Sequence, residues 1–301
     1  MLTYSSVPRG LAKGACFSST FLYPERVASN LDAVNRFAAD NGHRSNGSCA
    51  WSSLRFLQHQ DLPSNQREQG HPEVVWFCQS AQASHEFTPA LKSLMGDVQI
   101  PVNHAFSVNE QALFHSRYEA SADRFISLFP ELYESFSTLI RYVIFAKRDG
   151  YSGGTVSSRI GLIWLSPTTE WSDDEWLENL IHELVHNALF LEDLVHSIFS
   201  VGSSRLQQPD ALALSAIRQV KRGYDKSYHS AFVSQTLIEY YLAIEKPEKA
   251  ITFVYPLIIC LDDLRKNTLL VSEHGKELLI NLSRNALDKY SALTKVDSAL
   301  S

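Results

Sequence analysis

Residues 172–190 read SDDEWLENLIHELVHNALF, and this stretch decides the fold that the sequence predicts. Ser172, followed three residues later by Glu175, matches the capping box that opens a helix, because each side chain can bond the other residue's backbone amide. No Gly or Pro interrupts the chain from there to about Phe199. Apolar residues lie on nearly every side of the predicted helix, which is typical of a helix at the centre of a fold.

A short apolar run precedes this helix. Residues 160–165 read IGLIWL and are followed by Ser166 and Pro167, which together predict a strand. A second short strand is expected over Glu73–Cys78, after a polar loop at residues 62–72. Helices are expected over 121–143 with a break at Pro130, from Pro209 to about Val220, from near Ser227, and two or three times after Pro247. The predicted fold class is therefore mainly α with a small β-sheet (α+β), in which the central helix packs among other helices and a short strand comes before it.

The two parts of the chain differ in composition. Residues 1–120 are rich in Ser, Asn, Gly and Gln and predict an irregular lobe that contributes to substrate binding or forms a lid. Residues 121–301 predict a mainly helical catalytic region with the central helix. At 301 residues, the two parts are expected to form one compact unit.

Charge and cysteine usage limit the function classes. A net charge of -6 disfavours nucleic acid and anionic membranes as partners, because both need a basic surface. The sequence has no run of 18 apolar residues, and its N-terminus lacks a basic segment followed by an apolar core, so we expect neither a membrane span nor a secretory signal. The cysteines, scattered without paired spacing, are Cys16, Cys49, Cys78 and Cys260. This spacing favours reduced thiols in a cytoplasmic protein, whose oligomeric state stays open.

The central helix carries the motif His182-Glu183-Leu184-Val185-His186. Histidines four residues apart lie one turn apart on the same helix face, so both imidazoles can bind one metal ion. Glu183 would stand beside an open coordination position and can act there as a base or as an orienting acceptor. The alternative is a pair of surface histidines that flank a glutamate by chance. The capped apolar helix and the preceding strand favour the metal site.

Two protein ligands are too few, so a third group is needed. His196 lies ten residues after His186, which places it about 80° away and about 15 Å along the helix axis, out of reach of the same ion. His229, near the start of a later helix, and Glu239, ten residues further along that helix, are the candidates. Either ligand type suits a divalent ion. We expect His229 to be the third ligand, with Glu239 as the alternative.

A group of basic residues precedes His229, namely Arg218, Lys221, Arg222 and Lys226. In a chain of net negative charge such a group is usually a solvated helix face. Beside a metal ligand it can also bind an anionic co-substrate, because a guanidinium pairs with a carboxylate through two hydrogen bonds. Arg222 and Arg218 are therefore candidate cofactor-binding residues.

Two segments resemble a known family. The strand and motif within residues 160–190, and the arginine-containing segment that leads to YDKSYHSAFV at 224–233, are similar to the H-E-x-x-H domain found with peptide-modification gene clusters. The resemblance covers roughly residues 155–245, about a third of the chain. That family is described as dependent on iron(II) and 2-oxoglutarate and as hydroxylating β-carbons of residues in ribosomally made peptides.

The resemblance implies a role for each candidate residue. His182, His186 and His229 would bind Fe(II), and Arg222 or Arg218 would bind 2-oxoglutarate. The substrate would be a peptide or an amino-acid-derived molecule. Three histidines can leave three positions of an octahedral iron open, although such enzymes mostly use two histidines and a carboxylate. Glu183 has no settled part in such chemistry.

Two other function classes stay open. In a zinc metallopeptidase or other hydrolase, His182, His186 and either His229 or Glu239 would hold zinc, and Glu183 would activate its water. The strand Ile160–Leu165 would then align a peptide. A non-catalytic metal-binding protein would use the histidines structurally, which the intact pair and the capped helix disfavour. The sequence leaves the substrate and the choice between iron and zinc open.

Overall fold

The computed structural model of the chain divides into two compact units. One is Phe21–Ser197, which contains the motif and is called the H-E-x-x-H unit below. The other combines Met1–Thr20 with Ile198–Ser301 and is called the C-terminal unit. The structure describes residues 17–43, 50–60, 71–76, 105–300 and four residues between 87 and 92. The chain therefore divides near Thr20 and Ser197, whereas the expected boundary at residue 120 falls inside a helix.

The fold is mainly helical with a small sheet, as predicted from the sequence. The helices and turns described up to His196 are η1 (Thr20–Leu22), α1 (Pro24–Asp40), α2 (Ala50–Leu57), α4 (Val108–Leu128), α5 (Pro130–Leu139), η3 (Ser157–Arg159) and α6 (Asp173–His196). The strands in the same part of the chain are β1 (Glu73–Trp76), β2 (Tyr142–Phe145), β3 (Gly153–Gly154) and β4 (Leu162–Leu165). Residues 1–120 thus contain regular helices, where the sequence predicted an irregular lobe.

The four strands form one mixed sheet in the order β1-β2-β4-β3. The first three strands are parallel, with Val143 paired to Val74 on one side and to Ile163 on the other. β3 is antiparallel to β4 and lies at the edge of the sheet. The predicted strand before the motif helix is therefore confirmed as β4. β4 pairs with β2 along its length and with β3 at Trp164 and Leu165. Alignment of a peptide by Ile160–Leu165 stays a prediction of the hydrolase alternative.

The other sequence predictions for this unit are partly confirmed. The predicted strand at Glu73–Cys78 is found as β1, and residues 77 and 78 lie outside the described residues. The helical segment breaks at Pro130 as expected, but the prediction of helix as far as Val143 is wrong, because β2 begins at Tyr142. All four residues of β2 are buried, and a short buried strand has the same apolar pattern as a piece of buried helix.

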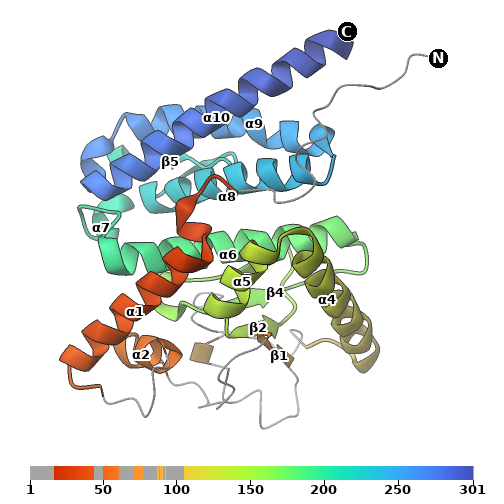
Figure 1. Ribbon diagram of the computed structural model, residues 1–301, viewed down its shortest axis with the longest axis vertical. Helices are drawn as coiled ribbons and strands as arrows, with labels where there is room; N and C mark the ends of the chain where they lie inside the picture. The colour runs from red at the N-terminus through yellow and green to blue at the C-terminus, as the bar shows by residue number, and fades with distance from the viewer. Residues whose placement is uncertain are drawn as a thin grey trace. The chain divides into compact units, whose positions relative to one another are not determined.

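Helix α6 is the central element of the H-E-x-x-H unit and packs against α1, α4 and α5 (Figure 1). Its first turn has the predicted capping box, since the Ser172 side chain accepts from the Glu175 N–H and the Glu175 side chain accepts from the Ser172 N–H. The helix ends at Ser197, which adopts a left-handed conformation with φ 54°. Half of its residues are buried, including an unbroken apolar core around Leu180 and Leu184. These features fix the position of the motif within the unit.

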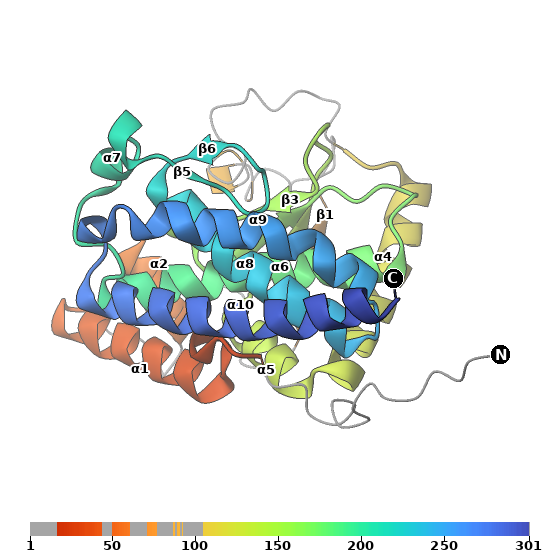
Figure 2. The ribbon, with the colours of Figure 1, turned by 90° about the horizontal axis from the view of Figure 1, so that it is seen from above.

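The C-terminal unit is built around three long helices. Its elements are α7 (Ser203–Leu206), η4 (Pro209–Ala211), β5 (Ala213–Leu214), β6 (Lys221–Arg222), α8 (Tyr224–Ala243), α9 (Pro247–Arg265), η5 (Thr268–Leu270) and α10 (Glu273–Leu300). Figures 1 and 2 both show α8, α9 and α10 as neighbouring helices. The helices predicted near Ser227 and after Pro247 are thus confirmed.

The predicted helix from Pro209 to Val220 is wrong. A 3-10 turn is followed by the hairpin of β5 and β6. Backbone amides of this hairpin donate to side chains later in the sequence. Leu214 N donates to Asp263 Oδ2 at 3.1 Å, and Ala216 N donates to Ser230 Oγ at 2.9 Å. Partners so far along the chain cannot be seen in a local sequence pattern.

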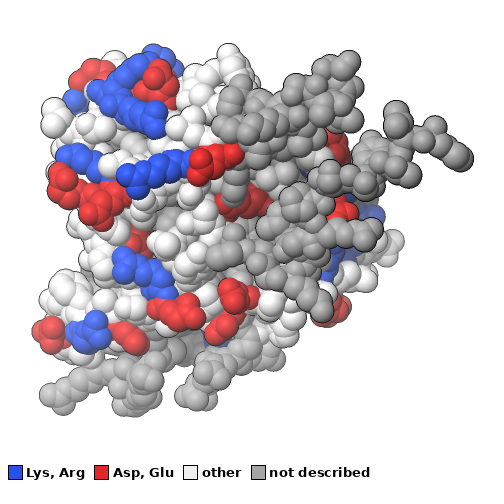
Figure 3. Space-filling view, turned by 45° about the horizontal axis from the view of Figure 1, so that its top comes forward, with Lys and Arg blue, Asp and Glu red and all other residues white. Residues whose placement is uncertain are grey.

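Three simpler expectations concern hydrophobicity, charge and thiols. No helix among the described residues is long and apolar enough to cross a membrane. On the face shown in Figure 3, acidic and basic side chains lie in small mixed groups. Cys260 is a buried free thiol, and burial raises its pKa to about 12. Cys16, Cys49 and Cys78 lie outside the described residues.

Candidate metal centre

The two motif histidines lie side by side on α6. The ring centroids of His182 and His186 are 5.0 Å apart, with 54° between the ring planes. A metal–nitrogen bond of about 2.1 Å plus about 1.2 Å from nitrogen to ring centroid places the centroids of two imidazoles on one ion about 4.7–5.4 Å apart, for octahedral to tetrahedral angles. The observed separation falls in this range, so the pair fits joint coordination of one metal ion.

The same face of the helix is only half-buried. Between Ile181 and Phe190 only His182, His186 and Phe190 are half-buried, and all the other residues are buried. These three positions follow each other at a spacing of four, and the Phe190 ring stacks on His186 with centroids 6.2 Å apart. His182, His186 and Phe190 therefore form the least buried stripe of this part of α6.

Glu183 lies at the edge of the sheet. Its side chain is only 4% exposed. A Cβ built on Gly153 of β3 would lie 3.6 Å from Glu183 Oε1 and 2.7 Å from the carbonyl oxygen of Trp164. Only glycine fits at this position, and the glycine lets the edge strand approach the motif carboxylate. The structure thus places His182 and His186 on one face of α6 and Glu183 on the neighbouring face, with β3 beside the glutamate.

The residue after the motif, Asn187, was not singled out from the sequence. It is completely buried, and its Oδ1 accepts the N–H of Gly161 at 2.7 Å. Its Nδ2 donates to Thr155 Oγ1 at 3.1 Å and to the carbonyl oxygen of Glu183 at 3.0 Å. A buried amide inside an apolar helix is a signal that sequence reading could have used, because such a group needs hydrogen-bond partners from another element.

The candidate third ligands both lie on α8 in the C-terminal unit. His229 is 4% exposed, and burial lowers its pKa to about 3, so its imidazole is neutral at physiological pH. The neutral ring is the form that binds metals. Glu239 is also buried, and its oxygens accept hydrogen bonds from Ser18 N at 3.1 Å and from Gln235 Nε2 at 3.0 Å. Glu239 would have to exchange these bonds for a metal.

The complete ligand set stays a prediction. Among the residues that the structure describes, no group of three or more His, Cys, Asp or Glu side chains is arranged to hold a metal ion. His182 and His186 belong to the H-E-x-x-H unit, whereas His229 and Glu239 belong to the C-terminal unit. The pair is therefore defined within one unit, and its third ligand is assigned only from the sequence.

The candidate arginines lie on the hairpin before α8. Arg222 is half-buried in β6, opposite Ala213, and Arg218 is exposed at the hairpin turn. The hairpin is bonded to the first turns of α8, since Ser227 Oγ donates to the Ala213 carbonyl oxygen at 2.7 Å. Arg218 therefore belongs to a turn, and the interpretation of this basic group as a helix face is wrong for it. Binding of 2-oxoglutarate by Arg222 or Arg218 stays a prediction.

A second polar network lies further along α6. The carboxylate of Glu192 accepts from Arg26 Nε at 3.1 Å and from Asn30 Nδ2 at 2.6 Å, and it also pairs with the terminal nitrogen of Arg26. His196 Nε2 lies 2.8 Å from Asn30 Oδ1. This network ties α6 to α1. His196 takes part in it at the end of α6.

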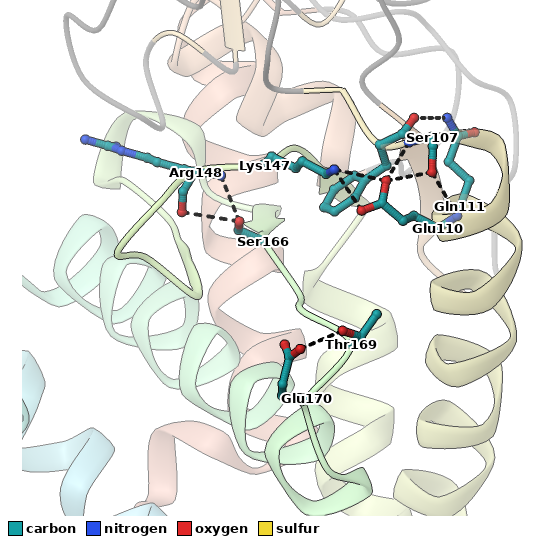
Figure 4. Close-up of polar contacts among 9 residues, drawn as sticks. Ser107, Glu110, Gln111, Lys147, Arg148, Ser166, Thr169 and Glu170 are labelled. Atoms are coloured by element: carbon teal, nitrogen blue, oxygen red, sulfur yellow. Dashed lines mark hydrogen bonds and ion pairs between the residues drawn. The ribbon is translucent and has the colours of Figure 1, made fainter.

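Another polar group lies where β2 and β4 end (Figure 4). The Lys147 ammonium is 2.9 Å from Glu110 Oε2 and 5.2 Å from the centre of the Phe106 ring. Hydrogen bonds from Lys147 and Ser107 lower the pKa of Glu110 to about 2. Ser166 Oγ accepts the Arg148 N–H at 2.8 Å. These contacts hold the segment after β2 to the start of α4, so the group stabilises the fold.

Comparison with known proteins adds no family assignment. No protein-family model matches the chain, and no curated protein is similar enough to count as a relative.

Proposed function

We propose that this protein is a metal-dependent oxygenase that uses iron(II) and 2-oxoglutarate. The proposed reaction hydroxylates an unactivated β-carbon of an amino-acid residue in a peptide or small substrate. The observation that carries the metal site is the 5.0 Å separation of the His182 and His186 rings on the half-buried face of α6. The choice of an oxygenase rests on the family resemblance of residues 155–245.

Each residue has a role in this proposal. His182, His186 and His229 would hold the iron, and three histidines would leave three octahedral positions open. Oxygen would be the oxidant at iron(II), and 2-oxoglutarate would supply two electrons and leave as succinate and carbon dioxide. The protein would orient the substrate and exclude water. Arg222 or Arg218 would pair with the distal carboxylate of 2-oxoglutarate. Glu183 would stand beside the metal as an orienting acceptor. A cytoplasmic location, with its reduced thiols, fits this chemistry.

A zinc hydrolase is the second candidate, and one observation favours it. The Glu183 carboxylate is buried beside β3, an edge strand made of two half-buried glycines. An extended peptide can add to such an edge through backbone hydrogen bonds. In this alternative Glu183 activates a zinc-bound water, and β3 shares the aligning role that the sequence assigned to Ile160–Leu165.

Anaerobic reconstitution separates the candidates. The oxygenase should show a weak visible charge-transfer band after addition of iron(II) and 2-oxoglutarate, and it should decarboxylate 2-oxoglutarate when oxygen is admitted. A His182→Ala variant should lose both signals. Absence of the band at saturating co-substrate contradicts the oxygenase. Cleavage of a peptide by the zinc form, lost in Glu183→Gln, would establish the hydrolase instead. Metal binding with neither activity would leave a non-catalytic metal-binding protein.

A further inference from the structure

We propose that Phe190 is a positioning residue for the metal pair: its ring stacks on the His186 imidazole and holds the plane of that imidazole relative to His182. This inference rests on the proposed metal site, because it concerns the orientation of one of the ligands. It is argued from contacts between side chains of α6 alone, and it assigns a role to a residue outside the H-E-x-x-H motif.

The three side chains lie in a row along the helix. His182, His186 and Phe190 are each four residues apart, which separates neighbours by about 40° around α6 and by about 6 Å along its axis. Side chains of a helix lean towards its N-terminus, so each member of the row lies against the one before it. The Phe190 ring therefore lies next to His186, on the side away from His182.

The planes of the three rings differ in their mutual angles. The His186 and Phe190 planes are only 22° apart, with centroids 6.2 Å apart, which is an offset stack. The His182 and His186 planes are 54° apart, with centroids 5.0 Å apart. The imidazole of His186 is therefore aligned with the phenylalanine ring, and in this orientation its separation from His182 fits one shared metal ion.

The plane of an imidazole needs such a contact, because the last torsion of histidine is soft. Rotation about the Cβ–Cγ bond has a broad, roughly two-fold preference and does not by itself select one ring plane. Each ring nitrogen lies about 1.1 Å from the axis of that bond, so a turn of about 30° moves it by about 0.6 Å. Metal–ligand distances tolerate only about 0.2 Å. Because the His186 ring turns by itself, this movement changes its position relative to His182.

The burial pattern of α6 separates Phe190 from the core residues of the helix. Leu189 and Leu191, its neighbours in the chain, are completely buried, whereas Phe190 is half-buried like the two histidines. Replacement of Phe190 by another apolar side chain should therefore disturb the core little, because large losses of stability come from fully buried positions. An effect of Phe190 on metal binding can thus be measured in a folded protein.

A second stacked pair in the same unit provides a matched control. Phe56 of α2 stacks on His43, with centroids 4.7 Å apart and 19° between the ring planes. This pair has the same two residue types and nearly the same angle as His186 and Phe190. His43 is not part of the motif, and its Nε2 lies 2.9 Å from Ser52 Oγ. Loss of the Phe56 ring should therefore affect stability alone.

The test is a cobalt(II) titration of the full chain, followed by visible spectroscopy, with the melting temperature of each metal-free protein measured alongside. Phe190→Leu, which removes the flat ring and stays apolar, should weaken cobalt binding about three- to tenfold, because fewer chains hold His186 in the binding orientation. Phe190→Tyr, which keeps the ring, should bind cobalt within about twofold of wild type. Phe56→Leu should also stay within about twofold, even where it lowers the melting temperature.

Three outcomes would overturn the proposal. Wild-type cobalt affinity in Phe190→Leu would give Phe190 no part in metal binding. Equal losses of affinity in Phe190→Leu and Phe190→Tyr would show that the flat ring does not position His186, and equal losses in Phe190→Leu and Phe56→Leu would reduce the effect to stability. Should Phe190→Leu fail to fold, Phe190→Met decides the question in the same way. Failure of the metal site itself is recognised separately, because cobalt affinity would then be the same in wild type and in His182→Ala.

Discussion

Helices α6 and α8 carry the candidate ligands in different environments. On α6, His182 and His186 lie on a half-buried stripe. α8 is buried along almost its whole length, and His229 is one of its buried residues. Their sequences suggest the opposite, because α6 has many large apolar residues and the first half of α8 is rich in Ser and Tyr. Burial of α8 is possible because its polar side chains find partners, such as Tyr228 OH on the Gly275 carbonyl oxygen at 2.9 Å.

Polar side chains of both helices bond groups on other elements. On α6, Asn187 and Glu192 make such contacts, which orient the helix. On α8, Ser227 Oγ donates to the Ala213 carbonyl oxygen, whereas Thr236 Oγ1 donates to a backbone carbonyl one turn earlier in the same helix. A buried polar residue on a helix can therefore serve either orientation or burial, and its partner tells which.

Replacement of the ligands on α8 should have the largest effect. His229→Ala should reduce metal affinity by more than the about 10–100-fold expected for an outer partner, because it removes a direct ligand. Glu239→Gln should change metal affinity little, since its carboxylate is already bonded to Ser18 and Gln235. Calorimetric zinc titration of both variants measures the difference. Full retention of metal by His229→Ala together with loss in Glu239→Gln would move the third ligand to Glu239.

Loss of the ion pair that ties α6 to α1 should have the next largest effect. Arg26→Ala leaves the Glu192 carboxylate, which is 1% exposed, with fewer donors. Removal of one partner from a buried pair costs about 3 kcal/mol, and the remaining Asn30 contact reduces this to about 2 kcal/mol. Urea unfolding measures the loss. Arg124→Ala, which breaks the more exposed pair with Asp174, is the control and should cost about 1 kcal/mol or less. Equal losses of unfolding free energy in Arg26→Ala and Arg124→Ala would show that burial of Glu192 does not increase the cost of losing its partner.

The start of α6 should have a smaller effect. Ser172→Ala removes the hydroxyl that caps the helix and should lower the free energy of unfolding by about 1 kcal/mol. Thermal unfolding measures the loss, and an unchanged melting temperature in Ser172→Ala would show that the cap does not stabilise α6.

The smallest effect concerns Glu110, which forms a capping box with Ser107 at the start of α4, remote from the candidate site. Glu110 has a pKa of about 2 in the folded chain, below the ordinary value of 4.5 for a glutamate, so its contribution to stability is present above pH 4.5 and is lost as the pH falls towards 2. Glu110→Gln should cost about 1 kcal/mol or less at pH 7, because the carboxylate is partly solvated, and almost nothing near pH 2. Urea unfolding across this range tests the trend. Lys147→Met should reproduce it, and a pH-independent difference would contradict it.

Local patterns predicted part of the fold. The capping box at Ser172, the strand at Leu162–Leu165 and the break at Pro130 depend on neighbouring residues, and all three are found. The β5–β6 hairpin was missed because its amides bond Asp263 and Ser230, far along the chain. The strand β2 was missed because four consecutive buried residues fit the apolar pattern of a strand and that of a buried helix equally well.

The candidate site likewise combines residues that local sequence patterns predicted with residues that they missed. The spacing of His182 and His186 predicts adjacent rings, since one helical turn separates them, and the structure agrees. Asn187 and Gly153 escaped notice because their roles depend on strands that approach α6 from other parts of the sequence. Sequence reading thus predicted which groups would bind a metal, and the structure adds the groups that contact the motif helix beside them.

Metal content after anaerobic reconstitution with iron(II) and removal of excess ion tests the pair itself. Wild-type protein should retain about one iron per chain, and His182→Ala/His186→Ala should retain almost none at an unchanged folded fraction. Asn30→Ala should match the wild type. Equal iron in wild type and in the double variant would contradict a metal site on α6 and, with it, the proposed reaction.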